Sequence, residues 1–302
     1  MKESYTLKHL FFFCFFLIFS GVLSAQYVSN VTYDYSCPCK VTVTYDIDPD
    51  LADLAVAGDV ALYYSSDTTQ GWTLATTFTG KTAGHHSDDF WDCHAAGVKY
   101  GLFYHKLEFV CPCRVRNAAS VVINGVEWAN RNVGTPGNFA ANPTSAGRFY
   151  QWNIRVGWSN TDPRTSSPAG RAWISYLTYD YTSTSWTSAN DPSPSGFRVP
   201  NAAQVNTLLD ADAVTMKWVT LNGVNGYCYT DKLNNNSIFL PAAGWRNGIP
   251  GTGVEGELMG VGLSGNYWTR TQSSGGEASY WNDSRFLKSW YKTGGYSVRP
   301  VK

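Results

Sequence analysis

The C-terminal segment between Gly265 and Val301 most constrains what this chain can fold into. Large aromatic and charged side chains crowd residues 280–292, and their spacing follows neither a period of two nor one of 3.6. A half-buried strand would alternate, and an amphipathic helix would repeat its apolar residues every three to four positions. The segment is also too aromatic for a disordered tail. Tyr, Trp and Arg mixed with Asn, Ser and Asp are typical of binding surfaces. We therefore predict an exposed binding face held between two strands.

Ten side chains of this face and its rim are the predicted ligand contacts. Aromatic residues supply desolvated anchors, whereas Arg285 and Lys288 supply directional polar contacts. The predicted contacts are Asn266, Arg270, Tyr280, Trp281, Asp283, Arg285, Phe286, Lys288, Trp290 and Tyr291. Other aromatic and apolar residues are predicted to be core instead, namely Trp128, Trp152, Trp245, Trp268, Tyr296 and Val298.

The first 25 residues have the pattern of a secretory signal peptide. Lys2 and Lys8 precede the apolar run 10–18, and small residues end the segment at Ala25. We therefore expect an exported protein, located at the cell surface, outside the cell or in the periplasm. The apolar run is shorter than the roughly 20 residues of a membrane helix, so no direct membrane span is expected.

Composition limits the partners and the fold class. The chain has 23 Lys and Arg residues against 23 Asp and Glu residues, so no nucleic-acid partner is expected. Its 302 residues suffice for two domains, and Gly, Ser, Thr, Asn, Tyr and Trp predominate over helix-forming charged runs. The prediction is a β-rich chain with two domains, at residues 26–118 and 119–302.

Short alternating runs separated by turns predict a β-sandwich for residues 26–118. Residues 41–45 alternate strictly, and strands are also predicted at 60–64, 72–74, 100–104 and 107–110. The order of these elements, resting on residues 41–46 and 59–66 with Trp91-Asp92, resembles immunoglobulin-like modules of bacterial surface proteins. Residues 85–89, His-His-Ser-Asp-Asp, are predicted to be a polar loop rather than a metal site.

Two Cys-Pro-Cys tripeptides flank this first domain. Cysteines one residue apart rarely bond each other, because the geometry is strained. Cross-pairs between Cys37 or Cys39 and Cys111 or Cys113 would clamp the ends of the domain, and export favours disulfides. Free thiols and a four-thiolate zinc site are the alternatives.

Residues 119–302 begin with a predicted hairpin at 121–129, and a short helix is predicted from Pro143. A second helix is predicted after Asn201, because Gln204 follows three residues later as in a capping box, with Val205, Leu208 and Leu209 on the buried side. A buried strand is predicted from Ile238.

Several motifs of this second domain appear together and in order. They are Val126–Gly134, Gly147–Asn153, Gly196–Pro200, Phe239–Gly244, Gly265–Thr269 and Ser297–Arg299. Over about 180 residues the chain thereby resembles the Fibrobacter succinogenes major paralogous domain, in the formylglycine-generating-enzyme-like branch of the C-type lectin fold. That resemblance implies an α+β C-type-lectin-like domain with a twisted antiparallel sheet, two helices and long loops. The ending Ser-Val-Arg-Pro-Val also resembles variable proteins of diversity-generating retroelements, which implies that residues 265–296 vary while the backbone persists.

Catalysis is not expected. The formylglycine-generating branch uses a pair of cysteines, and this domain offers only Cys228; the iron-dependent relatives need histidines, and none follows His105. No Gly-x-Ser-x-Gly elbow is present, and a Ser-His-Asp triad cannot form without histidine. We therefore predict a non-enzymatic ligand-binding protein.

Cofactors are not expected either, with calcium as the alternative that stays open. Trp281-Asn282-Asp283 spells the tripeptide at the calcium site of sugar-binding C-type lectins, but their upstream Glu-Pro-Asn or Gln-Pro-Asp loop is absent. The predicted partner is a protein or glycan on another cell, host or phage surface. A fixed carbohydrate-binding lectin and a structural subunit of a surface appendage are the alternative functions.

Overall fold

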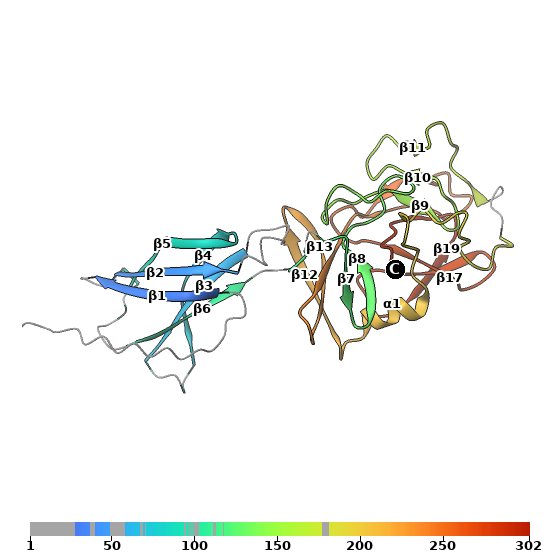
Figure 1. Cartoon of the computed structure of the whole chain (residues 1–302). Helices are drawn as coiled ribbons and strands as arrows, with labels where there is room; N and C mark the ends of the chain where they lie inside the picture. Colours follow the sequence, from blue (N-terminus) through green and yellow to red (C-terminus); the bar gives the residue numbers. More distant parts are fainter. Residues whose placement is uncertain are drawn as a thin grey trace, which may run out of the picture.

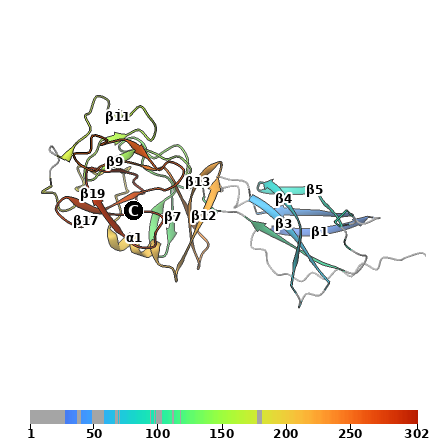
Figure 2. The same cartoon turned by 180° about the vertical axis from the view of Figure 1, so that it is seen from behind.

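The computed structural model describes residues 28–36, 40–48, 58–66, 69, 71–93, 95–96, 98, 103–110, 113–116, 118–176 and 181–302. Strands dominate these residues, which confirms that the chain is β-rich. Figure 1 shows β1 to β6 in one body and the elements from β7 to the C-terminus in another. The view from behind in Figure 2 shows the same separation. The predicted signal peptide, residues 1–25, lies outside the described residues.

The N-terminal body consists of two antiparallel sheets of three strands each. One sheet has the order β1-β2-β5 and the other β4-β3-β6. The strands are β1 (Val28–Ser36), β2 (Lys40–Ile47), β3 (Gly58–Ser65), β4 (Thr73–Lys81), β5 (Gly84–Asp92) and β6 (Tyr104–Val110).

The core of this body lies between the two sheets. Val43 and Tyr45 of β2 are buried with Val60 and Leu62 of β3 and with Trp91 of β5. The strict alternation of β2 produces this arrangement, because every second side chain of a strand points to the same face. A sandwich-type arrangement is therefore confirmed for the N-terminal body.

The predicted polar loop at residues 85–89 is wrong, because these residues belong to edge strand β5. Their polar side chains find partners on the neighbouring strands. The His85 Nδ1 atom lies 2.6 Å from Asp46 Oδ1, and the His86 ring stacks on Tyr45 at 5.1 Å. Asp89 accepts hydrogen bonds from the Tyr45 hydroxyl and from Lys81 Nζ. Cross-strand pairs of this kind stabilise a strand that lacks apolar alternation.

The C-terminal body contains four sheets in its described residues. Their strand orders are β11-β10-β9-β20-β15-β16, β12-β13-β14, β17-β18-β19 and β7-β8. The strands are β7 (Ser120–Ile123), β8 (Val126–Ala129), β9 (Phe149–Gln151), β10 (Gly157–Trp158), β11 (Ser166–Ser167), β12 (Val214–Leu221), β13 (Val224–Asp231), β14 (Ser237–Pro241), β15 (Trp245–Arg246), β16 (Leu258–Met259), β17 (Tyr267–Gln272), β18 (Glu277–Trp281), β19 (Lys288–Tyr291) and β20 (Gly295–Tyr296).

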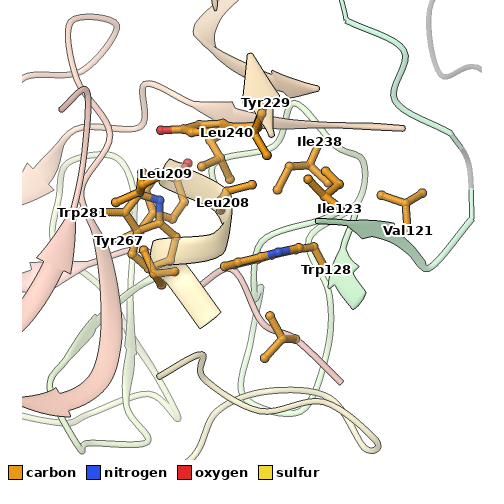
Figure 3. Close-up of a cluster of buried hydrophobic side chains, with 13 residues drawn as sticks. Val121, Ile123, Trp128, Leu208, Leu209, Tyr229, Ile238, Leu240, Tyr267 and Trp281 are labelled. Carbon is orange, nitrogen blue, oxygen red and sulfur yellow. The ribbon is translucent and has the colours of Figure 1, made fainter. Parts of the chain in front are cut away.

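The helix predicted after Asn201 is confirmed as α1 (Ala202–Leu209). Asn201 Oδ1 accepts from the Gln204 backbone N–H at 2.8 Å, and Gln204 Oε1 accepts from the Asn201 N–H at 3.1 Å, which completes the capping box. Leu208 and Leu209 pack among Trp128, Tyr267 and Trp281 (Figure 3). None of the described residues forms a helix long and apolar enough to cross a membrane.

The predicted helix from Pro143 is wrong, because residues 142–148 form turns and irregular backbone. Asn142 Oδ1 accepts from the Thr144 N–H, the Thr144 hydroxyl and the Ser145 hydroxyl, which satisfies these groups locally. Gly147 then takes a φ of +74°. Asx turns of this type compete with helix formation.

Two other local predictions are confirmed. The hairpin predicted at 121–129 is β7 and β8, and the buried strand predicted from Ile238 is β14. The predicted core residues are buried with the exception of Trp245, which is half-buried.

The predicted cross-pairing of Cys113 is wrong. Cys113 forms a disulfide with Cys228 of β13, 115 residues later, with 5.5 Å between their Cα atoms. The pairing follows from packing, because the neighbouring Val115 is fully buried beside Ser237 of β14. Cys113 is therefore held against the C-terminal body. Cys37, Cys39 and Cys111 lie outside the described residues.

Candidate functional site

The aromatic run 280–292 is two strands and a loop, not the irregular surface that its spacing predicts. Trp281 is opposite Tyr267 on β17, while Tyr280 is opposite Trp268 on β17 and Lys288 on β19. At the end of β18 both faces are covered, because Tyr280 packs in one apolar cluster and Trp281 in another. Adjacent residues of a strand point to opposite faces, so two successive buried aromatics interrupt the alternation that Glu277 and Ser279, both half-buried, begin.

The segment enters this sheet through a tight approach at Gly265. A Cβ atom at residue 265 would lie 2.4 Å from the carbonyl oxygen of Pro241. The Tyr267 hydroxyl also donates to this oxygen, at 2.8 Å. Only glycine fits at such a close backbone approach without displacing the chain. The start of the segment is therefore fixed against β14.

Three of the ten predicted contacts are buried, and their predicted exposure is wrong. Trp281 is 0% exposed, stacks on Tyr267 at 5.4 Å and meets Trp128 edge to face at 6.0 Å (Figure 3). Tyr280 packs against Tyr296 at 4.9 Å, and its burial raises its pKa, with a smaller contribution from Asp283. Asn266 is also buried. Aromatic clusters of this kind contribute to the core because they bury large areas.

The loop 282–287 between β18 and β19 is anchored to other elements through its backbone and one cation. Tyr229 donates its hydroxyl hydrogen to the Asn282 carbonyl oxygen at 3.3 Å. Arg285 Nη1 donates to the Val214 carbonyl oxygen at 3.1 Å. Inside the loop, Asn282 Oδ1 accepts from the Ser284 N–H at 3.3 Å. Together with a longer contact from Arg285 Nη1 to the Leu209 carbonyl oxygen at 3.5 Å, these bonds connect the loop to α1, β12 and β13. Arg285 thus lies in the predicted site but acts as an anchor of its loop.

The exposed part of the site is a small group of side chains on and beside this loop. Phe286 is 62% exposed, and Asp283 is also exposed. The Lys288 Nζ atom lies 5.6 Å from the centre of the Phe286 ring and 4.0 Å from Asp283 Oδ1. An exposed aromatic ring beside an ammonium group, with a carboxylate nearby, can make apolar and charged contacts with one partner. We call Asp283, Phe286 and Lys288 the loop face.

The other three predicted contacts are half-buried and do not belong to the loop face. Trp290 and Tyr291 of β19 meet edge to face at 5.6 Å, and Trp290 packs partly against the apolar cluster around Trp268. Arg270 Nη2 donates to the Trp186 carbonyl oxygen at 3.1 Å. Each of these side chains therefore combines a structural contact with partial exposure.

The tripeptide Trp281-Asn282-Asp283 is divided between the core and the surface. Trp281 points into the core, and the side-chain oxygen of Asn282 accepts from both the N–H and the hydroxyl of Ser284. Among the described residues, no group of three or more His, Cys, Asp or Glu side chains is placed to hold a metal ion.

His105 lies in the N-terminal body, where burial lowers its pKa to about 4.

The structure also reveals a narrow pocket that the sequence reasoning missed. It opens between β13, β14 and the C-terminal segment, next to the loop face. The residues that line it are Tyr227, Tyr229, Leu240, Ala242, Gly265, Tyr267 and Asn282. No local sequence pattern marks this pocket; the nearest sequence signal is the hairpin turn Asn222-Gly223 that joins β12 to β13, with φ values of +49° and +76°. Such a turn fixes the register of its strands and so places Trp218 opposite Tyr227.

No protein-family model, curated protein or solved structure matches this chain. The functional argument therefore rests on the chemistry of the loop face and its surroundings.

Proposed function

We propose that this chain is an exported, non-enzymatic ligand-binding protein of the adhesin or receptor-binding type. In this proposal the N-terminal sandwich is an immunoglobulin-like spacer. Residues 119–302 form a C-type-lectin-like domain, and its C-terminal segment presents the ligand face. The ligand is a protein or a glycan on another surface, and binding involves no turnover.

One observation carries the proposal: a large apolar side chain is exposed on a loop that is otherwise firmly held. Phe286 is 62% exposed, so its ring contributes little to the stability of the folded chain. Its neighbours Arg285 and Asn282 are hydrogen-bonded to β12 and β13. An exposed aromatic residue on an ordered loop loses little conformational entropy when it binds a partner. The loop face thereby has the physical properties of a binding anchor.

The same arrangement supports the proposal that residues 265–296 are diversified. Buried residues such as Trp281 maintain the sheet, and exposed residues such as Phe286 can change at small cost to stability. A segment built in this way can exchange its ligand contacts without losing its backbone.

Sequencing codons 265–296 across a growing population of the cells that carry this gene tests diversification. We expect substitutions at the exposed positions 283, 286 and 289, and constant residues at Tyr267 and Trp281. A segment that is invariant throughout the population would contradict diversification. A ligand screen with and without a calcium chelator would then examine the fixed-lectin alternative.

Two matched libraries of the full chain test the binding face itself. One library randomises residues 283, 286 and 289, and the control library randomises the buried residues 280 and 281. We expect most members of the first library to remain resistant to proteolysis and to yield binders against arrayed surface proteins and glycans. Members of the control library should mostly be degraded. A first library that folds and binds nothing would contradict the proposed function.

A further inference from the structure

Strand β12 has one free edge in the described part of the chain. It pairs with β13 along its whole length without a bulge, and its other edge pairs with no described strand. Both views of the fold show β12 at the margin of the C-terminal body (Figure 1, Figure 2). Thr215, Lys217 and Thr220 are exposed, and Trp218 is 40% exposed. The edge is therefore open to solvent.

The hydrogen-bond pattern shows which residues of β12 direct their backbone groups to this edge. In an antiparallel ladder, alternate residues direct both the N–H and the C=O group toward the partner strand, and the residues between them direct both away from it. Val214 is of the second kind, because neither of its groups bonds β13. Its N–H donates to the Asp210 carbonyl oxygen at 2.9 Å, and its carbonyl oxygen accepts from Arg285 Nη1 at 3.1 Å.

Met216, Trp218 and Thr220 follow Val214 at intervals of two, so their N–H and C=O groups also point away from β13. None of these groups has a hydrogen-bond partner among the described residues. Such an edge is a template for a further strand, and proteins commonly guard it with proline, a bulge or several charges. β12 contains neither proline nor a bulge, and Lys217 is its one charged residue. The edge can therefore accept another strand.

The spacing of the free groups fits a second copy of the same strand in antiparallel orientation. When Trp218 lies opposite Trp218 of the second copy, Met216 lies opposite Thr220, and every free N–H and C=O group finds a partner. Sliding the second copy by two residues instead would set Lys217 opposite Lys217, and like charges directly opposite each other destabilise a strand pair. The symmetric register centred on Trp218 is therefore favoured.

We propose that two copies of this chain form a dimer by pairing their β12 strands about a two-fold axis, which joins their β12-β13-β14 sheets into one. A two-fold interface uses the same surface on both copies, and this edge is complementary to itself. The rings of Trp218 and Tyr227, 4.9 Å apart, lie beside their counterparts in the dimer, which buries the exposed indole. The inference goes beyond the proposed ligand-binding function and does not depend on it. A dimer presents two loop faces and so increases avidity for a surface that carries several ligands.

Sedimentation velocity of the full chain measures this association over protein concentrations from roughly 1 μM to roughly 1 mM, because a single pair of strands forms a small interface. We expect a monomer–dimer equilibrium. Trp218→Lys sets two ammonium groups opposite each other and should raise the dissociation constant at least about tenfold. The matched control Thr215→Lys adds the same charge at an exposed position of β12 away from the axis and should change it by less than about twofold. A chain that stays monomeric, or a dimer that Trp218→Lys leaves intact, would overturn the proposal.

Cysteine substitution tests the register and decides the question if Trp218→Lys does not fold. The Cα atoms of a directly opposed, hydrogen-bonded pair lie about 5.5 Å apart, which is within the range of a disulfide. We expect Trp218→Cys to form a disulfide-linked dimer under mild oxidation, detected by non-reducing gel electrophoresis. The control Thr215→Cys lies opposite Leu221 of the second copy in this register and should not cross-link. Equal cross-linking of the two variants would contradict the register and the dimer.

Discussion

Replacing Trp281 and Phe286 separately with alanine tests how the C-terminal segment is divided between core and surface. Trp281 is 0% exposed and in contact with Tyr267 and Trp128, so Trp281→Ala leaves a large cavity. We expect it to lower the free energy of unfolding by about 3–5 kcal/mol. Phe286 is 62% exposed, so Phe286→Ala should change the free energy of unfolding by less than about 0.5 kcal/mol.

A third variant refines this prediction. The Trp281 indole nitrogen finds no hydrogen-bond partner in the described part of the chain. Trp281→Phe keeps an aromatic ring between Tyr267 and Trp128 and removes an unsatisfied donor. The smaller ring still loses contacts, but loss of the donor offsets part of that cost. We therefore expect a destabilisation of about 1–2 kcal/mol, well below that of Trp281→Ala.

Urea unfolding followed by tryptophan fluorescence measures all three variants. Of the 12 tryptophans, ten lie beyond residue 118, so the signal reports mainly on the C-terminal body. With a denaturant dependence of about 2 kcal/mol per molar urea, Trp281→Ala should move the midpoint down by about 1.5–2.5 M. Phe286→Ala should leave the midpoint nearly in place. If the two alanine variants lose similar stability, the division into buried sheet and exposed loop face is refuted.

Three other predictions concern parts of the chain outside the loop face. Cys228→Ser should lower the stability of the oxidised protein by about 4 kcal/mol in urea unfolding, because the disulfide with Cys113 closes a long loop; an equal midpoint for wild type and variant would show that the bond adds nothing. Asn201→Ala should cost about 1 kcal/mol in the same assay, since it removes the α1 cap, whereas Asn201→Asp should retain most of the stability. Burial lowers the pKa of His105 from 6.5 to about 4 in the folded chain. As the pH falls, the His105 imidazole is therefore protonated in the unfolded chain at a higher pH than in the folded chain. The stability of the N-terminal body should therefore fall as the pH falls from about 6.5 to about 4, and a pH profile of His105→Gln that retains the same slope would contradict this cause.

Local elements of the fold followed from the sequence because short-range interactions determine them. The alternation of β2 predicts a strand with one buried face, and Asn201 with Gln204 predicts the start of α1.

Contacts between distant segments decided the remainder. Residues 85–89 look like a polar loop until β2 supplies the partners for His85 and Asp89. Cys113 bonds Cys228 because Val115 and β14 hold the intervening chain against the C-terminal body, and no local pattern records that proximity.

The candidate site shows the same division within one segment. The sequence correctly marked residues 265–301 as rich in large side chains, but composition alone assigns no side chain to the interior or the surface. Trp281 is buried because α1 and Trp128 cover it, and Phe286 is exposed because its loop passes beyond that cover. Burial depends on which distant element lies opposite a residue, and only the tertiary structure specifies that element. The sequence by itself therefore determined strands with clear alternation such as β2, the helix cap and the aromatic content, whereas the tertiary structure decided which aromatics are buried and which are exposed.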